Sequence, residues 1–303
     1  DGGGRKTVQH LEGGIIERFL VKEGQQVKAG QPLVQLDRTQ SAARYAALLT
    51  NYYTLLALDA RLTAERTGAG GVAYPKELTD QAAANPEVKQ IIAASDTVFH
   101  ARRRALGEQV SILSQRLGQA SAEIASVNAQ ASSLSQQHRL LAEEAAGIRT
   151  LVNEGLERKS RLLGLERQLS ATNGQQGQLA GNRARIHDSM GETRAQMSFL
   201  RGQQITEAAA QQREVQLSLA EARERLQVGR DVLKRQQILA PVNGRVINLR
   251  FVTAGGVVGA AQPLLDIVPT GEKIVISARV KANDIDVVHE GQRAEIKLTP
   301  YKA

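Results

Sequence analysis

A segment near the start of the chain recurs near its end. Residues 13–36 align without a gap with residues 244–267, at a constant offset of 231 residues (244 minus 13). A repeat of this kind indicates two copies of one structural unit. The aligned pairs include Gly13/Gly244, Ile15/Val246, Ile16/Ile247, Gly24/Gly255, Val27/Val258, Pro32/Pro263, Leu33/Leu264 and Leu36/Ile267.

Each copy reads as short β-strands. Apolar residues alternate with polar ones, the chain turns at Gly24 or Gly255, and a closing strand follows a Gln-Pro step. Two-stranded pieces are at best marginally stable alone in water. We therefore expect the two copies to pair about a pseudo-twofold axis in one small β-sandwich, which the chain leaves and re-enters.

The segment between the copies shows heptad spacing. From Leu106 to Val152, apolar residues recur in alternating steps of four and three residues and so form a seam along one side of a helix. His138 is the polar member of this series. This spacing is typical of a helix in a left-handed coiled coil. A second series, from Leu162 to Leu233, predicts the antiparallel partner helix.

The second series is less regular than the first. Polar Gln176, Arg183 and Gln204 lie on or near it. The step from Gln211 through Val215 to Leu219 resembles a stutter. We interpret the glutamines as tolerated substitutions; the alternative is that they supply polar groups to neighbouring copies in a bundle.

These patterns predict an α+β protein, in which a long antiparallel α-helical coiled-coil hairpin splits the β-sandwich. The repeated segments also resemble lipoyl domains, and the run from Asp284 to Ala294 resembles a family signature that implies the start of a β-barrel after a lipoyl-like sandwich. The first two helices together hold about as many residues as the third, so we expect them to form one outgoing arm. The expected segments are 1–37 and 237–269 for the two β-halves, 38–236 for the hairpin and 270–303 for the barrel. Within the hairpin we expect helices over 38–66, 97–152 and 158–236 and a tip over 153–157.

Composition restricts the class of protein. Aromatic residues make up 3% of the chain and Trp is absent, which argues against large globular cores. The net charge of +8 permits nucleic-acid binding, but we read the run Arg102-Arg103-Arg104 as a solvated helix face and expect no nucleic-acid partner. The chain has no cysteine, which excludes disulfides and thiolate metal sites. No stretch has the length of a membrane span.

Motifs that carry catalysis are missing from the sequence. There is no Gly-x-x-x-x-Gly-Lys-Ser/Thr loop, no Gly-x-Ser-x-Gly elbow and no Gly-x-Gly-x-x-Gly loop. We therefore predict no enzyme activity, no catalytic residues and no cofactor. The histidines show no metal-ligand spacing, so we predict no metal site; they are His10, His100, His138, His187 and His289. We interpret His138 as a polar residue that sets helix register rather than a pH switch.

Two other functions would fit part of this pattern. A cytoplasmic coiled-coil scaffold explains the heptads but not the repeat. A biotinyl or lipoyl carrier explains the repeat, since Val-x-x-Gly-x-x-Val followed by Pro-Leu resembles the half-motif of those domains, and Ala240-Pro241 resembles its second-half opening. In a carrier a Lys lies on the turn that joins the halves. Here Asp37 and Arg38 follow the first half, and the hairpin is inserted.

The combined pattern resembles the periplasmic adaptors, or membrane fusion proteins, of bacterial export systems. The run His10-Leu11-Glu12-Gly13-Gly14 and the following repeat are similar to the type I secretion branch related to the haemolysin-secretion adaptor, which includes adaptors that export proteases or lipases. The run from Asp284 to Ala294 is similar to that family's barrel signature. The resemblance covers nearly the whole chain.

The resemblance implies a function in one-step protein secretion. Members link an inner-membrane ABC transporter to an outer-membrane channel and form homo-oligomeric rings, here expected to be hexamer-like. The implied location is the periplasm of a Gram-negative bacterium, with an inner-membrane anchor outside these 303 residues. The implied cargo is an unfolded protein such as a protease, lipase or toxin.

The resemblance also places the channel contact at the hairpin tip. Related drug-efflux adaptors carry an Arg, a Leu and a Ser at the tip, and Arg149, Leu151 or Val152, and Ser160 stand nearest to that pattern, although the spacing to the middle residue differs. The expected partner-binding residues are Arg149, Asn153, Glu154, Gly155, Leu156, Arg158 and Ser160.

Overall fold

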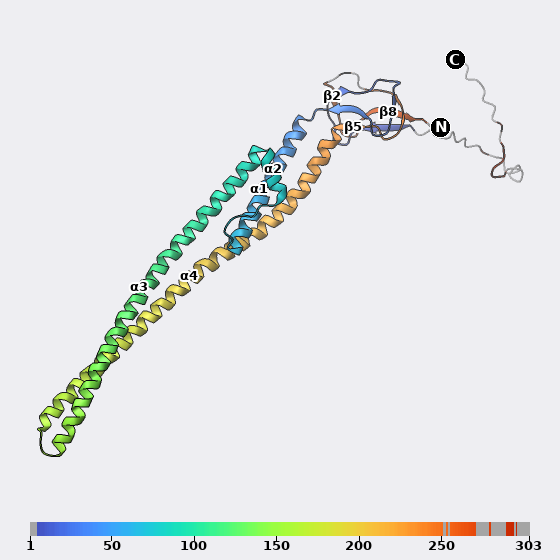
Figure 1. The fold of residues 1–303 in the computed structure, drawn as a ribbon. Coiled ribbons are helices and arrows are strands. Elements are labelled where there is room, and N and C mark those ends of the chain that lie inside the picture. The colour runs from blue at the N-terminus through green and yellow to red at the C-terminus, as the bar shows by residue number, and fades with distance from the viewer. Residues whose placement is uncertain are drawn as a thin grey trace. The chain divides into compact units, whose positions relative to one another are not determined.

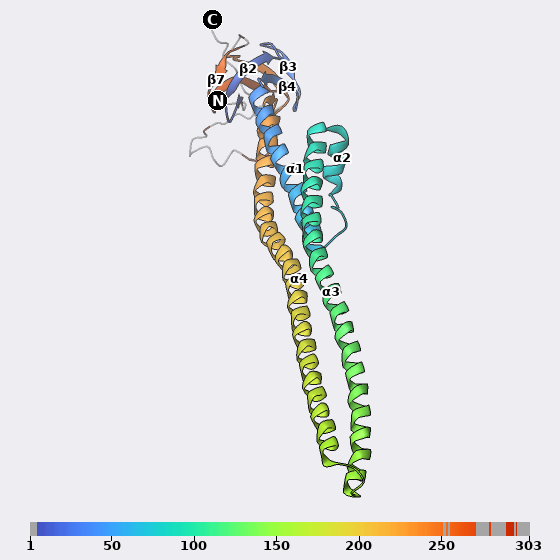
Figure 2. The same ribbon diagram turned by 90° about the vertical axis from the view of Figure 1, so that its left-hand side faces the viewer.

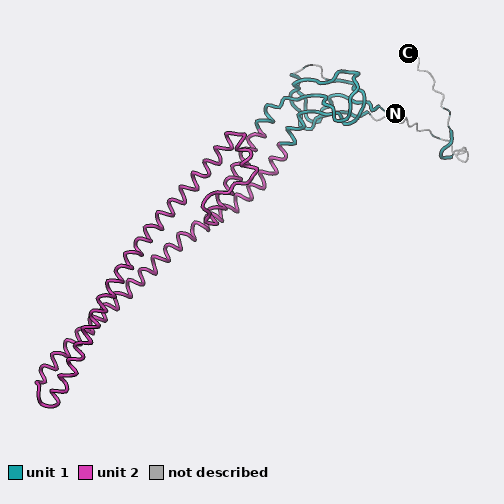
Figure 3. The backbone as a smooth tube through the Cα atoms, in the orientation of Figure 1, with its two compact units in different colours: residues 1–43, 230–303 teal, residues 44–229 magenta. Residues whose placement is uncertain are grey.

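The computed structural model describes residues 5–250 and 255–270, together with 253, 279, 289–293 and 295. The chain divides into two compact units (Figures 1 and 3). One unit holds residues 1–43 and 230–303, and the other holds residues 44–229. The expected barrel over 270–303, including the run that starts at Asp284, lies outside the described residues except for the few positions named above.

Strands from both ends of the chain build the first unit, the β-domain. Its two antiparallel sheets have the strand orders β1-β8-β6-β3 and β5-β4-β2-β7. Each sheet therefore mixes strands from before and after the hairpin. The strands are β1 (Lys6–Gln9), β2 (Gly14–Phe19), β3 (Gln26–Val27), β4 (Pro32–Leu36), β5 (Gln237–Leu239), β6 (Gly244–Ile247), β7 (Val257–Val258) and β8 (Pro263–Pro269).

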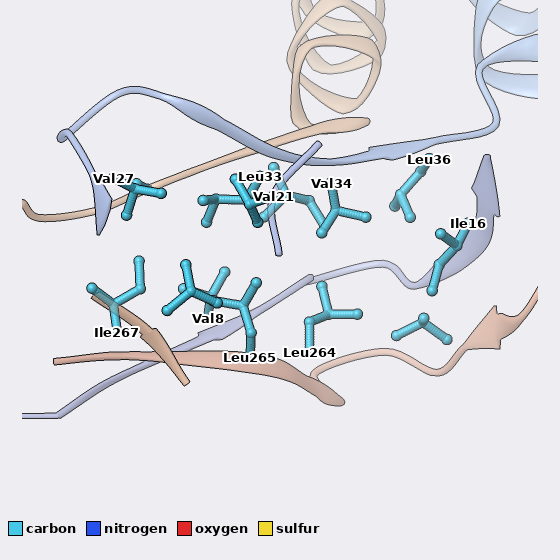
Figure 4. Packing of buried hydrophobic residues seen from close by; sticks show 14 residues of the cluster. Val8, Ile16, Val21, Val27, Leu33, Val34, Leu36, Leu264, Leu265 and Ile267 are labelled. Carbon is cyan, nitrogen blue, oxygen red and sulfur yellow. The ribbon is translucent and has the colours of Figure 1, made fainter. Parts of the chain in front are cut away.

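A single apolar core lies between the two sheets (Figure 4). Many of its side chains are fully buried, and burial of one Leu or Ile stabilises a fold by about 1.5–3 kcal/mol. The predicted sandwich of paired halves is confirmed. The core residues are Val8, Ile16, Val21, Val27, Leu33, Val34, Leu36, Ile238, Ala240, Val246, Val258, Leu264, Leu265 and Ile267.

Strand pairing corrects the predicted register of the repeat. Gly14 lies opposite Val258, and Gly244 lies opposite Val27. Because Val27 and Val258 are equivalent in the repeat, Gly14 is the structural counterpart of Gly244. The gapless alignment of Gly13 with Gly244 is therefore wrong by one residue in this strand.

The shift changes which side chains enter the core. Ile16 and Val246 are both fully buried and are counterparts, whereas Ile15 corresponds to Arg245 and is 48% exposed. A one-residue shift moves each side chain to the other face of a strand. The later part of the repeat keeps its predicted register, since Leu36 and Ile267 lie opposite Ile16 and Val246, respectively.

The two ends of the hairpin meet where β4 pairs with β5. The Leu36 amide donates to the Gln236 carbonyl at 2.9 Å. His10 is buried, and its Nε2 lies 3.1 Å from the Arg235 carbonyl oxygen and 3.5 Å from the Glu12 carboxylate. Glu12 in turn accepts hydrogen bonds from the Arg235 guanidinium, which hold the pKa of Glu12 below its usual range. The points where the chain leaves and re-enters the β-domain are thus held together.

Four helices form the second unit and its connections. They are α1 (Thr39–Thr67), α2 (Lys76–Ala84), α3 (Pro86–Asn153) and α4 (Lys159–Arg235). The predicted start of the second long helix at Thr97 is wrong, because Asn85 caps α3 through a bond from the Glu87 amide to its side chain at 2.9 Å, and Pro86 follows as the first helical residue. Helix α2 was not predicted.

Helix α1 and the first turns of α3 lie side by side (Figure 2), which corrects the prediction that they form one continuous arm. Their shared cluster contains Tyr52 and Leu56 from α1, Leu78 from α2, Val88 from α3 and Leu219 from α4, among others. Helix α1 is buried on most sides here, as expected for a helix inside a bundle.

Buried charges join α1 to α3. Glu65 is almost fully buried and accepts from Arg61 at 2.5 Å and from Arg102 at 3.2 Å. Arg103 donates to the Gly70 carbonyl. All three arginines of the basic run are exposed, as the interpretation of a solvated face expects, and Arg102 and Arg103 in addition bond to Glu65 and to the loop after α1.

The α3–α4 coiled coil is packed most tightly toward the tip. Ala145, Ile148, Leu162 and Leu165 are buried in one cluster. Farther from the tip most seam residues are half-buried, His138 included, and Val127 and Met190 are buried exceptions. Two open grooves lie between the helices there. One, of about 540 Å³, is lined by Leu113 and Leu200 among others, and one of about 430 Å³ is lined by Leu134 and Leu179.

The irregular step in α4 lies at Gln212, not at Gln211. Residues Gln204, Ala208, Gln212 and Val215 turn toward the other helices, in steps of four, four and three. Gln212 is buried, donates to Asp59 at 3.1 Å and Thr63 at 2.7 Å, and accepts from Arg66 at 3.1 Å. The stutter therefore coincides with the level at which α1 ends. Arg183, expected on or near the seam, is exposed.

Candidate partner-binding site at the hairpin tip

The tip is a short turn of defined geometry between α3 and α4. Gly155 has a φ of 75°, a left-handed conformation that glycine adopts readily. The Gly155 amide donates to the Val152 carbonyl at 3.1 Å, and the Leu156 amide donates to the Leu151 carbonyl at 2.8 Å. These two bonds define a Schellman motif, which satisfies carbonyls at the end of α3. The tip predicted over 153–157 is observed over 154–158.

Exposed leucines surround this turn. Leu156 is 72% exposed, Leu163 is 44% exposed and Leu151 is 39% exposed. Their neighbours Val152 and Leu162 face the coiled-coil core instead. We call Leu151, Leu156 and Leu163 the tip leucines. Exposed apolar side chains grouped at one end of a helical hairpin are suited to contact another protein.

Ion pairs brace the helices on either side of the turn. Arg149 of α3 donates to Glu166 of α4 at 2.8 Å. Arg161 lies 3.3 Å from Glu157 and 3.8 Å from Glu144. The Glu157 carboxylate also accepts from the Arg158 amide at 2.9 Å, and this bond lowers the pKa of Glu157 below its usual range.

The predicted site residues occupy three kinds of position. Glu154, Leu156 and Arg158 lie in the exposed turn, with Gly155 between them, and Asn153 and Ser160 are exposed at the adjoining helix ends. Arg149 lies one turn away and is already paired with Glu166. Of the two candidates for the middle residue of the drug-efflux pattern, Leu151 is exposed and Val152 packs inward.

Leu163 was not predicted as a site residue. It follows the seam residue Leu162 directly, so a large apolar residue one step off the heptad seam was the available signal. Leu151 likewise lies next to a seam residue, since it directly precedes Val152. The arrangement offers apolar contact and paired charges.

The described part of the chain shows neither a metal-ligand cluster nor a membrane-spanning helix. No group of three or more His, Cys, Asp or Glu side chains there could hold a metal ion. No helix in the same residues is long and apolar enough to cross a bilayer.

Comparison with known proteins gives consistent results. A family profile described as "AprE, long alpha-helical hairpin" matches residues 41–232. The chain is 32% identical over 296 residues to the type I secretion system membrane fusion protein PrsE of Rhizobium meliloti, and 30% identical over 299 residues to the alkaline protease secretion protein AprE of Pseudomonas aeruginosa. These alignments cover 98% and 99% of this chain, and 67% and 69% of the relatives.

A solved structure is similar over most of the chain. The soluble domain of LipC, a membrane fusion protein of a type I secretion system, matches with a TM-score of 0.82 and 31% identity. The match covers 88% of this chain and all of the LipC chain.

Proposed function

Because the chain belongs to the type I secretion membrane fusion proteins with an AprE-type hairpin, we propose that it links an inner-membrane ABC transporter to an outer-membrane channel. Its relatives AprE and PrtE are named for the secretion of proteases. The cargo proposed for this chain is accordingly a secreted protein of the protease, lipase or toxin type. The chain would act in the periplasm, without catalysing a reaction itself.

The observation that carries this proposal is the hairpin itself. Helix α4 holds 77 residues, which corresponds to about 115 Å at 1.5 Å per residue. The end far from the β-domain in sequence presents the tip leucines and the exposed turn residues Glu154 and Arg158. A long arm with an apolar, charged end is suited to reach a partner across a gap.

The proposed channel contact comprises the predicted residues and two of the tip leucines. Leu156 would enter an apolar depression on the channel, while Arg158 and Glu154 would pair with channel charges around it. Arg149 would act mainly as a brace, since Glu166 already holds it. The proposed set is Arg149, Leu151, Asn153, Glu154, Gly155, Leu156, Arg158, Ser160 and Leu163.

Two finer features belong to the same proposal. Several copies would stand around a common axis as a ring, because a single hairpin does not enclose a path for a polypeptide. We take a hexamer-like ring as the working arrangement. An inner-membrane anchor outside these 303 residues would hold the β-domain near the transporter.

A charge-reversal variant of the tip tests the proposal. Glu154→Arg combined with Arg158→Glu should cut export of the cargo about tenfold or more, because charge pairs at an interface become repulsive. Both side chains are exposed, so the helix content and thermal unfolding should not change. The measurement is secreted cargo in the medium relative to cargo in the cells.

The matched control places the same reversal on the middle of α3. Glu123→Arg with Arg139→Glu also alters two exposed charges and should leave export unchanged. Full export by the tip variant, at normal protein levels, would refute docking through the tip.

A further inference from the structure

Each long helix of the hairpin contains a stretch without charged side chains. Residues 124–138 of α3 and 168–182 of α4 hold no Asp, Glu, Lys or Arg, and elsewhere in both helices charged residues follow one another more closely. Ion pairs between side chains four residues apart stabilise a helix. Neither stretch can form such a pair, and no ion pair can join one stretch to the other.

The two stretches face each other across the seam. Both line the open groove of about 430 Å³, to which Leu134 of α3 and Leu179 of α4 contribute apolar side chains. These two leucines are only half-buried. The other lining residues are polar, and most are amides: Gln130, Ser133, Gln137, Gln175, Gln178 and Asn182. We call residues 130–138 and 174–182 the charge-free level of the hairpin.

The seam of the charge-free level also contains small and polar side chains. Ala131 and His138 of α3 and Gln176 of α4 are half-buried there. A coiled coil is stabilised when large apolar side chains of one helix fill the holes between side chains of the other. Packing between α3 and α4 is therefore weak at this level.

Each helix is also intrinsically weak at the charge-free level. Gly174, Gly177 and Gly181 are exposed on α4, and a Cβ added to any of them would meet nothing within 4 Å. Close packing within the chain therefore does not require these glycines. Glycine is the poorest helix former after proline, and bends in helices commonly occur at Gly and Ser. On α3 the level contains serines at Ser132, Ser133 and Ser135.

The hairpin is held more firmly on either side of this level. Toward the tip, α3 and α4 share the buried cluster around Ile148 and Leu165 and are joined by ion pairs. At the level where α1 ends, Leu62 of α1 is buried in one cluster with Ala208 and Val215 of α4. Segments with few buried apolar contacts open at a lower free-energy cost than well-packed segments. The charge-free level is thus a weak joint between two well-packed parts.

We infer that the charge-free level is a hinge, at which the tip half of the hairpin bends relative to the half that packs with α1. Bending there breaks no ion pair and disturbs little buried apolar area. Protein hinges are commonly a few residues that absorb the change in backbone angles. The use of this hinge rests on the proposed function: a jointed arm reaches a channel that does not stand directly in line with the transporter.

Distances within α4 test the hinge. These 303 residues contain no cysteine, so Arg167→Cys, Glu192→Cys and Leu217→Cys place spin labels, two at a time, at exposed positions. The Arg167–Glu192 pair spans the charge-free level, and the Glu192–Leu217 pair does not. Each pair is 25 residues apart (192 minus 167, and 217 minus 192), which corresponds to about 38 Å at 1.5 Å per residue.

Double electron–electron resonance gives the distribution of each distance. The labelled full-length protein is diluted with unlabelled protein, so that only distances within one chain contribute. We expect the distribution across the charge-free level to be about twofold wider than that of the other pair. Equal widths would overturn the hinge.

Replacement of the glycines should stiffen the hinge. Gly174→Ala, Gly177→Ala and Gly181→Ala together should narrow the distribution across the level about twofold, because alanine favours a helix far more than glycine does. The matched control makes the same change at three exposed glycines of α3 outside the level and should leave the width unchanged: Gly107→Ala, Gly118→Ala and Gly147→Ala. Equal narrowing by this control would contradict a local hinge.

A second stiffened variant acts through α3 and leaves the glycines in place. Ser132→Glu with Gln136→Lys puts an ion pair four residues apart on the exposed side of α3. It should narrow the same distribution about 1.3-fold. Because the two variants alter different helices, their shared effect is stiffness and not the loss of a contact made by one surface. No narrowing by either variant would overturn the hinge.

Export separates this inference from the proposed function. Both stiffened variants should lower export of the cargo, the glycine variant about threefold, whereas the control variant should export normally. Normal export by both stiffened variants would overturn the use of the hinge in docking. If the widths are equal and the charge-reversed tip variant fails to export, the hinge falls and tip docking stands. If the hinge is measured and the tip variant exports normally, tip docking falls and the hinge stands.

Discussion

The core of the β-domain and the middle of the hairpin are both apolar seams, but they are packed very differently. Leu33, Leu264 and Ile267 are fully buried between two sheets. In the hairpin, Leu113 and Leu134 are half-buried and line open grooves of about 540 and 430 Å³. The β-domain therefore has an enclosed core, whereas the seam in the middle of the hairpin is partly open to solvent.

The largest expected effect comes from the β-domain core. Leu264→Ala should lower the free energy of unfolding by about 2–5 kcal/mol, because a fully buried leucine leaves a cavity. Leu117→Ala on the half-buried hairpin seam should cost about 1 kcal/mol, since less apolar area is lost. Hydrogen exchange of strand and helix peptides measures both. Equal costs at the two positions would contradict the comparison.

Acid should affect the β-domain before the hairpin. Hydrogen bonds from the side chains of Asn248 and Thr7 hold the pKa of buried Asp266 below its usual value of 3.8, and the bond from Asn248 has the larger effect. A lowered pKa in the folded state stabilises the fold above the ordinary value, and this contribution is lost as the pH falls from about 4 through the lowered pKa.

Asp266→Asn tests this dependence. The variant should lose about 1–3 kcal/mol at pH 7 and show a flatter loss of strand protection between pH 5 and pH 3. An unchanged pH dependence would show that Asp266 is not responsible.

Two glutamines of α4 allow the stability contributions of a buried and a half-buried polar residue to be compared within the hairpin. Gln212 is buried and makes three side-chain hydrogen bonds at the end of α1, so Gln212→Ala should cost about 1–2 kcal/mol. Gln176 lies half-buried on the same helix, and Gln176→Ala should change stability by less than about 0.5 kcal/mol. Thermal unfolding by circular dichroism compares the two. Identical melting shifts would contradict a special role for Gln212.

The smallest effect is a gain in stability. Gly177 lies in α4, and a Cβ added there would meet nothing within 4 Å. Gly177→Ala should therefore stabilise the isolated chain by about 0.5–1 kcal/mol, because glycine is a poor helix former. A lower melting temperature would show that this glycine has a packing role within one chain.

The sequence predicted the two regions to different depths. Heptad spacing located α4 nearly to its ends, and the repeat located the β-domain. Neither pattern could place α2 or the start of α3, because Leu78 and Val88 are buried only when α1, α3 and α4 pack together. The one-residue shift at Gly14 was also hidden, since two adjacent glycines and two adjacent isoleucines allow either register until strand pairing selects one.

The tip was predicted better than its exact contacts. Asn153 and Gly155 gave its place through the backbone freedom that Asn and Gly offer. Which leucines face outward depended on the packing of Val152 and Leu162 in the neighbouring seam, and that required the paired helices.

The central claim is that the hairpin tip contacts an outer-membrane channel, and crosslinking from Leu156 tests it most directly. A photoreactive amino acid replaces this 72% exposed residue in Gram-negative cells that carry the secretion system, and mass spectrometry identifies the crosslinked partner. The account predicts a crosslink to the outer-membrane channel, and none from the same probe at exposed Ser133 in the middle of α3. Crosslinks from Leu156 only to cytoplasmic proteins or nucleic acid would contradict it.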